Sequence, residues 1–68
     1  MIFEVETEDS IDSPVTAREV STFAAYAAEN GCYFYLVVPS AEESRAQDLL
    51  QDAEKANPRK TFVLGIDL

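Results

Sequence analysis

The sequence predicts an α/β fold of the βαβαβ type: a three-stranded parallel sheet in the order 1-2-3, with two helices packed mainly on one face. Apolar segments suited to strands open the chain, occupy its middle and lie near its end. Segments with small or apolar residues at helical spacing lie between them. Strands that alternate with helices pair in parallel through right-handed crossovers, which gives this fold class.

Chain length predicts a single small α/β domain over residues 1–68. A chain of this size buries only about 60% of the surface that its unfolded form exposes, so its stability margin is small. The 13 acidic and 5 basic residues give a formal net charge of −8. Direct nucleic-acid binding by the isolated chain is disfavoured, because phosphate neutralisation dominates that affinity. A neutral or basic protein partner, or a divalent cation, is accommodated more easily.

The single cysteine, Cys32, excludes a disulfide within the chain and is typical of a reducing compartment. We expect the chain to start directly in a strand without a basic leader. No apolar run is long enough to span a bilayer. The sequence therefore predicts a cytoplasmic protein without a membrane segment.

The first strand is predicted from residue 1 to about residue 8, where apolar or β-branched residues alternate with acidic ones. One face carries Met1, Phe3, Val5 and Thr7. The other face carries Ile2 and three carboxylates, Glu4, Glu6 and Glu8. Residues 9–14 are polar and are typical of a turn.

The first helix is predicted over residues 17–29. Thr16 is a good N-cap, and Glu19 three residues later completes a capping box. Small and apolar residues follow at helical spacing, and an alanine-rich face allows close approach to the sheet. Asn30 and Gly31 stop the helix, since glycine adopts the left-handed conformation after a helix end.

The second strand is predicted over residues 32–38, which are apolar or aromatic throughout, as in a central strand covered on both faces. After Pro39, Ser40 and Glu43 form a second capping box. The second helix continues from there with an apolar stripe and is closed by Asn57 and Pro58. Residues 61–66 form the third strand.

Strand order follows from the contrast between the first two strands. The carboxylates make the first strand a poor central strand, so the second is placed in the middle and one sheet face receives no helix. The sequence leaves open whether Tyr33 and Tyr35, or their neighbours Phe34 and Leu36, lie on that face. An apolar patch of this kind is expected to bind a second copy or another protein. The interface candidates are Tyr33, Tyr35, Phe62 and Leu64.

Three segments, IFEVETEDS, TAREVSTFAAYAAENGCYFYLVVP and TFVLGI, together resemble the C-terminal half of the PD-(D/E)XK (restriction-endonuclease-like) nuclease fold. The family has a strand with an acid-x-lysine or acid-x-acid signature, then an amphipathic helix and a hydrophobic strand. The resemblance implies that Glu4 is a metal-binding acid and that Glu6 stands where lysine is usual, with Mg²⁺ as the metal. The family's first aspartate lies on a preceding strand, so the site implied here is incomplete.

Three roles stay open for the acidic face of the first strand: a solvated edge, a Mg²⁺ or Ca²⁺ site, or a partner-binding surface. A further group is expected beyond the carboxyl ends of the strands, where open parallel sheets bind ligands. Turn and cap roles account for the same residues. This binding rim consists of Glu8, Asp9, Asp12 and Ser40.

The leading functional prediction is a non-catalytic domain that acts through protein–protein association, as a homodimer or with another chain. The alternative is an enzyme, a divalent-metal-dependent nuclease that uses Glu4 and Glu6 and is completed by a second copy or another chain. A third alternative is an acidic inhibitor that mimics the charge of nucleic acid. No motif in the sequence selects a substrate.

Overall fold

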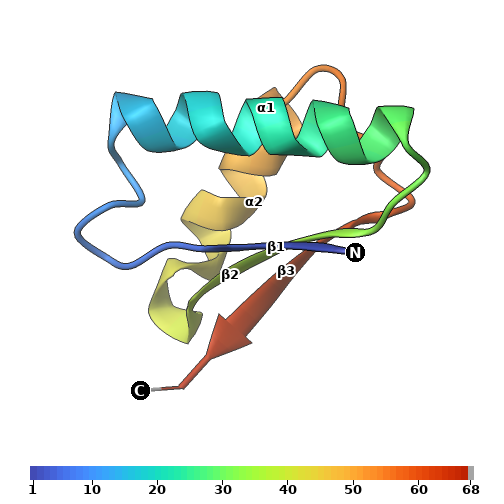
Figure 1. Ribbon diagram of the computed structural model, residues 1–68. Helices are drawn as coiled ribbons and strands as arrows, with labels where there is room; N and C mark the ends of the chain where they lie inside the picture. The colour runs from blue at the N-terminus through green and yellow to red at the C-terminus, as the bar shows by residue number, and fades with distance from the viewer. Residues whose placement is uncertain (68) are drawn as a thin grey trace.

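The computed structural model describes residues 1–67 and has the predicted α/β architecture (Figure 1). Its strands are parallel and lie in the order β1-β2-β3. Both long helices cover the same face of the sheet, so the predicted fold class is confirmed. The elements are β1 (Ile2–Val5), α1 (Pro14–Glu29), β2 (Phe34–Pro39), the 3₁₀ helix η1 (Ser40–Glu42), α2 (Glu43–Asp52) and β3 (Thr61–Ile66).

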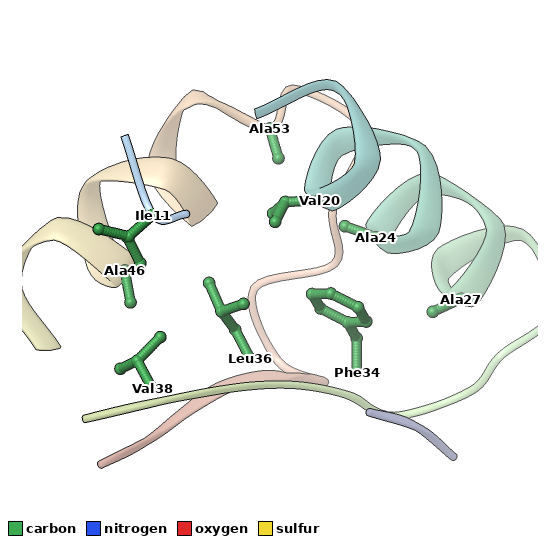
Figure 2. Close-up of a cluster of buried hydrophobic side chains, with 9 residues drawn as sticks. All are labelled: Ile11, Val20, Ala24, Ala27, Phe34, Leu36, Val38, Ala46 and Ala53. Carbon is green, nitrogen blue, oxygen red and sulfur yellow. The ribbon is translucent and has the colours of Figure 1, made fainter. Parts of the chain in front are cut away.

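The core fills the space between the sheet and the two helices (Figure 2). The side chains of Phe34, Leu36 and Val38 point from β2 toward the helices, and the first two are fully buried. Alanines at the helix surfaces let the helix backbones approach these larger side chains closely. The other buried members are Ile11, Val20, Ala24, Ala27, Ala46 and Ala53.

Helix α1 begins earlier than the sequence predicted, so the expected N-cap at Thr16 is wrong. Ser13 is the cap, and its hydroxyl accepts a hydrogen bond from the Val15 N–H at 3.2 Å. Pro14 occupies the first helical turn, where its missing N–H costs nothing and its fixed φ suits the helix. Thr16 is buried inside this turn and bonds elsewhere.

Strand β1 is shorter than predicted and ends at Val5 rather than near Glu8. The N–H groups of Ser10 and Ile11 donate to the Thr7 carbonyl, at 3.2 and 3.0 Å. These bonds turn the chain back toward α1 and take Glu8 out of the strand. Ile11, in the segment predicted only as a polar turn, is 1% exposed and belongs to the core.

The second predicted capping box is also wrong. Ser40 lies in η1, and its hydroxyl donates to Asp67 Oδ1 at 2.5 Å instead of capping a helix. Helix α2 ends at Asp52, well before Asn57, because Ala53 takes an extended conformation. Strand β2 starts two residues later than expected, whereas β3 has the predicted bounds. Within residues 1–67, no helix combines the length and the hydropathy needed to cross a bilayer.

Candidate functional site

The sheet face opposite the helices is not covered by any described element (Figure 1). Strand register places Phe3, Tyr35 and Phe62 in one row across the three strands, and Val5, Val37 and Leu64 in the next. We call this surface the open sheet face. Its exposed members are Met1, Phe3, Val5, Tyr33, Phe62, Leu64 and Ile66, with Tyr35 and Val37 at the centre.

Aromatic rings form a continuous layer on the open sheet face. The Tyr35 ring centroid lies 5.0 Å from that of Phe3 and 5.4 Å from that of Phe62. Tyr33 extends the layer, 6.1 Å from Phe62 and 6.5 Å from Tyr35. These separations are typical of stacked aromatic pairs. All four predicted interface residues, Tyr33, Tyr35, Phe62 and Leu64, thus come together on one face, while their role as an interface stays a prediction.

Charge is nearly absent from the open sheet face over the described residues. Lys60 stands at its margin, where the Nζ atom is 5.4 Å from the Tyr33 ring centroid and donates to the Gly31 carbonyl at 3.1 Å. The exposed side chains of the face are 41–72% accessible. At about 150–250 Å² for each aromatic side chain, and somewhat less for each aliphatic one, these exposed fractions amount to on the order of 700 Å². The largest apolar patch on a typical monomer is about 300–600 Å², so this face is unusually large.

Glu4 of β1 and Glu6, which directly follows the strand, lie on the helix side of the sheet, where Glu6 is buried. Oxygens of Glu4, Glu6 and Glu19 all lie within 4.8 Å of one another, with Glu19 supplied by α1. We call these three residues the carboxylate cluster. Glu6 is only 8% exposed, while Glu8, which was predicted to share their face, is in the following turn and exposed.

Hydroxyl groups make the burial of Glu6 tolerable. Ser10 Oγ donates to Glu6 Oε1 at 2.7 Å, and Thr16 Oγ1 lies 3.2 Å from the same oxygen. The Thr16 hydroxyl also lies 2.7 Å from the Ser10 carbonyl oxygen, while the Ser10 hydroxyl accepts from the Thr7 N–H. A buried carboxylate is costly unless it is hydrogen-bonded, so these contacts hold Glu6 in place.

The pKa values of Glu4 and Glu6 are shifted in opposite directions. A hydrogen bond to Glu6, partial burial and the charges of Glu6 and Glu19 raise the pKa of Glu4 to about 7. Burial alone would raise the pKa of Glu6, but hydrogen bonds with Glu4, Ser10 and Thr16 outweigh it and lower that pKa. The two carboxyl groups therefore share a proton up to about neutral pH, with Glu4 as its main carrier.

The predicted binding rim is only partly assembled. Glu8, Asp9 and Ser40 line a cavity of about 600 Å³ at the carboxyl ends of the strands, together with Val5 and Ile66 of the open sheet face. Asp12 lies apart from it, in the hollow between the first loop and α2, where it pairs with Arg45. That ion pair removes Asp12 from the rim.

Sequence reasoning missed three partners of the β1 carboxylates. Thr16 and Glu19 were assigned to a capping box, and Ser10 to a turn. The spacing of Thr16 and Glu19 could have indicated this role. Residues three apart in a helix share a face, so both of these side chains meet the same strand. Lys60 was also missed as the charged margin of the open sheet face.

Comparison of the chain with protein-family models, with curated proteins and with solved structures found no match. The resemblance to half of a PD-(D/E)XK nuclease fold therefore stays a prediction. The features of this chain that indicate a function are the open sheet face and the carboxylate cluster.

Proposed function

We propose that the protein is a non-catalytic association domain that forms a homodimer by packing its open sheet face against the same face of a second copy. The observation that carries this proposal is the large, nearly uncharged and aromatic-rich surface left uncovered by the helices. Two sheets packed face to face lie about 10 Å apart with interdigitating side chains. The present face has the alternating apolar rows that such packing requires.

The area of the face fits a stable dimer. Two copies, each contributing about 700 Å² of apolar side chain, would bury on the order of 1,400 Å² in total. Specific stable interfaces bury about 1,200–2,000 Å². Tyrosine is enriched among residues that dominate binding energy, and Tyr33 and Tyr35 occupy this surface.

The net charge of −8 is large, but it opposes self-association only weakly because of where the charges lie. The carboxylate cluster includes Glu19 of α1 and so lies on the helix side of the sheet, away from the open sheet face. Charges held behind the sheets are separated by more than the roughly 8 Å over which salt screens them at physiological ionic strength. The apolar surfaces can therefore meet without bringing acidic groups together at the centre of the interface.

Sedimentation equilibrium over a wide concentration range tests this proposal. We expect the wild-type chain to change from monomer to dimer mass, and Phe62→Lys to remain a monomer because an ammonium group would be buried at the interface. Tyr26→Lys is the matched control, since Tyr26 is an exposed aromatic residue on α1 and outside the face. Circular dichroism confirms that each variant is folded. A wild-type chain that keeps a monomer mass at every concentration would contradict the proposal.

A second candidate function, which we also propose, is divalent-cation binding at the carboxylate cluster. Three carboxylates with oxygens within 4.8 Å supply the ligand type that Mg²⁺ and Ca²⁺ prefer. A bound Mg²⁺ would supply the Lewis acidity that activates water in hydrolytic sites. Glu4, Glu6 and Glu19 would hold it, although Glu6 Oε1 already accepts hydrogen bonds from hydroxyl groups.

Titration with Mg²⁺ or Mn²⁺ tests this second candidate. Binding would shift or broaden the backbone amide resonances of β1 and the first half of α1, and Glu19→Gln would weaken the effect by removing one ligand. Asp48→Asn is the control, because Asp48 is an exposed acid on α2 outside the cluster. No spectral change at millimolar metal would eliminate this candidate without affecting the dimer proposal.

A further inference from the structure

The charged residues beside the open sheet face are unevenly distributed along the strands. Because the strands are parallel, their amino ends share one edge of the face and their carboxyl ends share the other. Lys60 directly precedes β3, and its ammonium lies against Tyr33 at the amino edge. Asp67 directly follows β3, where its Oδ1 accepts a hydrogen bond from the Ser40 hydroxyl, and Glu8 and Asp9 come after β1, also at the carboxyl edge. The face thus has a basic margin at one end of β3 and an acidic margin at the other.

When two sheets pack face to face with their strands aligned, a two-fold axis can relate them in two ways. If the axis runs along the strands, β3 lies over β1 of the partner and both chains run in the same direction. Asp67 then approaches Glu8 and Asp9 of the partner subunit, which brings like charges together. If the axis runs across the strands, β3 lies over β3 of the partner in the opposite direction. Lys60 then approaches Asp67 of the partner subunit, and the reciprocal pair forms by symmetry.

We infer that the two-fold axis of the homodimer runs across the strands, so that Lys60 of each copy lies against Asp67 of the partner subunit. This inference rests on the proposed function, because it specifies the geometry of that dimer. Opposite charges at the interface margin favour the correct register, and like charges disfavour the alternative. The arrangement across the strands satisfies both conditions, whereas the arrangement along the strands violates the second.

The cavity at the carboxyl edge gives Lys60 a place to bind. Ile66 of β3 and Pro39 of β2 provide apolar walls on the side of this cavity that lies next to Ser40, to which Asp67 bonds. A lysine side chain suits such a site, because its methylene stem packs on apolar surface while its ammonium stays with charged or solvated groups. The Lys60 ammonium donates to the Gly31 carbonyl within its own chain and keeps further donors for a partner.

Charge reversal at the two positions distinguishes the two axes. We expect Lys60→Glu and Asp67→Lys each to raise the dimer dissociation constant by roughly tenfold, because each replaces two attractive pairs by two repulsive ones. A mixture of the two variants should form a heterodimer in excess of the statistical half, since both of its pairs are again attractive. Native mass spectrometry separates the three dimers by mass. The double variant should dimerise about as tightly as the wild type.

Matched controls change net charge equally at sites on the helix layer. Arg18→Glu on α1 and Asp48→Lys on α2 should leave the dissociation constant near the wild-type value. Tighter dimerisation of Asp67→Lys, with statistical mixing, would show an axis along the strands and overturn the inference while leaving the dimer proposal intact. A wild-type chain that never dimerises would overturn both.

Discussion

At the scale of single residues, Glu6 shows how a small domain buries a charge. Its carboxylate is nearly inaccessible, yet it accepts hydrogen bonds from Ser10 and Thr16 and shares a proton with Glu4. The burial cost of a carboxylate without such partners would exceed what a core of this size can offset. The local cluster therefore controls how stability responds to acid and base.

Glu4→Gln tests the proton shared within the carboxylate cluster. Because the pKa of folded Glu4 lies at about 7, above its ordinary 4.5, folding takes up a proton between these values. The free energy of unfolding contributed by Glu4 is therefore greatest at low pH and falls as pH rises from about 4.5 to about 7. The amide keeps a donor for Glu6 and cannot ionise, so the variant should lose this fall.

Urea denaturation in metal-free buffer measures this effect. Above about pH 7, Glu4→Gln should be more stable than the wild type, and the difference should shrink toward pH 4.5. Glu6 acts in the opposite sense, since its lowered pKa adds stability at neutral pH that is lost on acidification. Its contribution remains in the variant, which should still unfold in acid. An unchanged pH profile would show that Glu4 carries no shared proton.

Thr16→Val tests the hydroxyl contacts of Glu6. The substitution keeps the shape of the side chain but removes the group that lies within bonding distance of Glu6 and of the Ser10 carbonyl. Both acceptors keep another donor, Ser10 Oγ for Glu6 and the Ser13 N–H for the Ser10 carbonyl, so we expect a loss of about 0.5–1.5 kcal/mol in the free energy of unfolding. Thr22→Val, on an exposed position of α1, should change the free energy of unfolding by less than about 0.5 kcal/mol. Equal effects of the two substitutions would argue against the Thr16 contacts.

At the scale of elements, helix α1 is capped by Ser13, which the capping-box pattern did not predict. Thr16 with Glu19, and Ser40 with Glu43, both have capping-box spacing, but neither pair caps a helix. Pro14 extends α1 by a turn and makes Ser13 the cap, while Ser40 bonds to Asp67 across the sheet edge. Spacing alone cannot decide such cases, because the same residues also satisfy partners that are distant in the sequence.

Ser13→Ala should therefore destabilise the protein by about 1 kcal/mol through the loss of the α1 cap. Ser40→Ala is the comparison, since it removes a bond to an exposed side chain and leaves both helix ends unchanged. Chemical denaturation of the two variants measures the difference. A larger loss in Ser40→Ala would indicate that the η1 segment, rather than the α1 cap, limits stability.

The strands show how far the sequence predicts this fold and its candidate site. The uninterrupted apolar run of β2 and the carboxylates of β1 were sufficient to predict strand order and the uncovered face. The direction in which β1 faces was not predictable, because alternation defines two faces without assigning either to the core. Ile2 packs against the core, and Ser10 and Thr16 satisfy Glu6, so the carboxylates turn inward and Phe3 turns outward.

At the scale of the whole molecule, the proposed dimer would link stability to association. The core is a single layer between three short strands and two helices, and the other sheet face is left to solvent in one copy. A domain this small often gains part of its stability from oligomerisation. Binding of a second copy to the folded state alone shifts the unfolding equilibrium by mass action.

The melting temperature should therefore rise with protein concentration in the wild type. In the same experiment, Phe62→Lys should melt at one temperature at every concentration, because the buried ammonium group would prevent the proposed dimer from forming. Differential scanning calorimetry over a hundredfold concentration range measures both. A wild-type melting temperature that does not depend on concentration would separate stability from association and contradict the link.

Strand β2 has a further consequence for how the chain folds. Within residues 1–67 it pairs with both β1 and β3, which do not pair with each other, and each pairing joins residues roughly 30 positions apart in the chain. Neither pairing can form before a long crossover has closed, and contacts of such high sequence separation slow folding. The open sheet face is therefore complete only after both crossovers have closed. Assembly of the proposed dimer would then be a separate second-order phase, which becomes slower on dilution while the first phase does not.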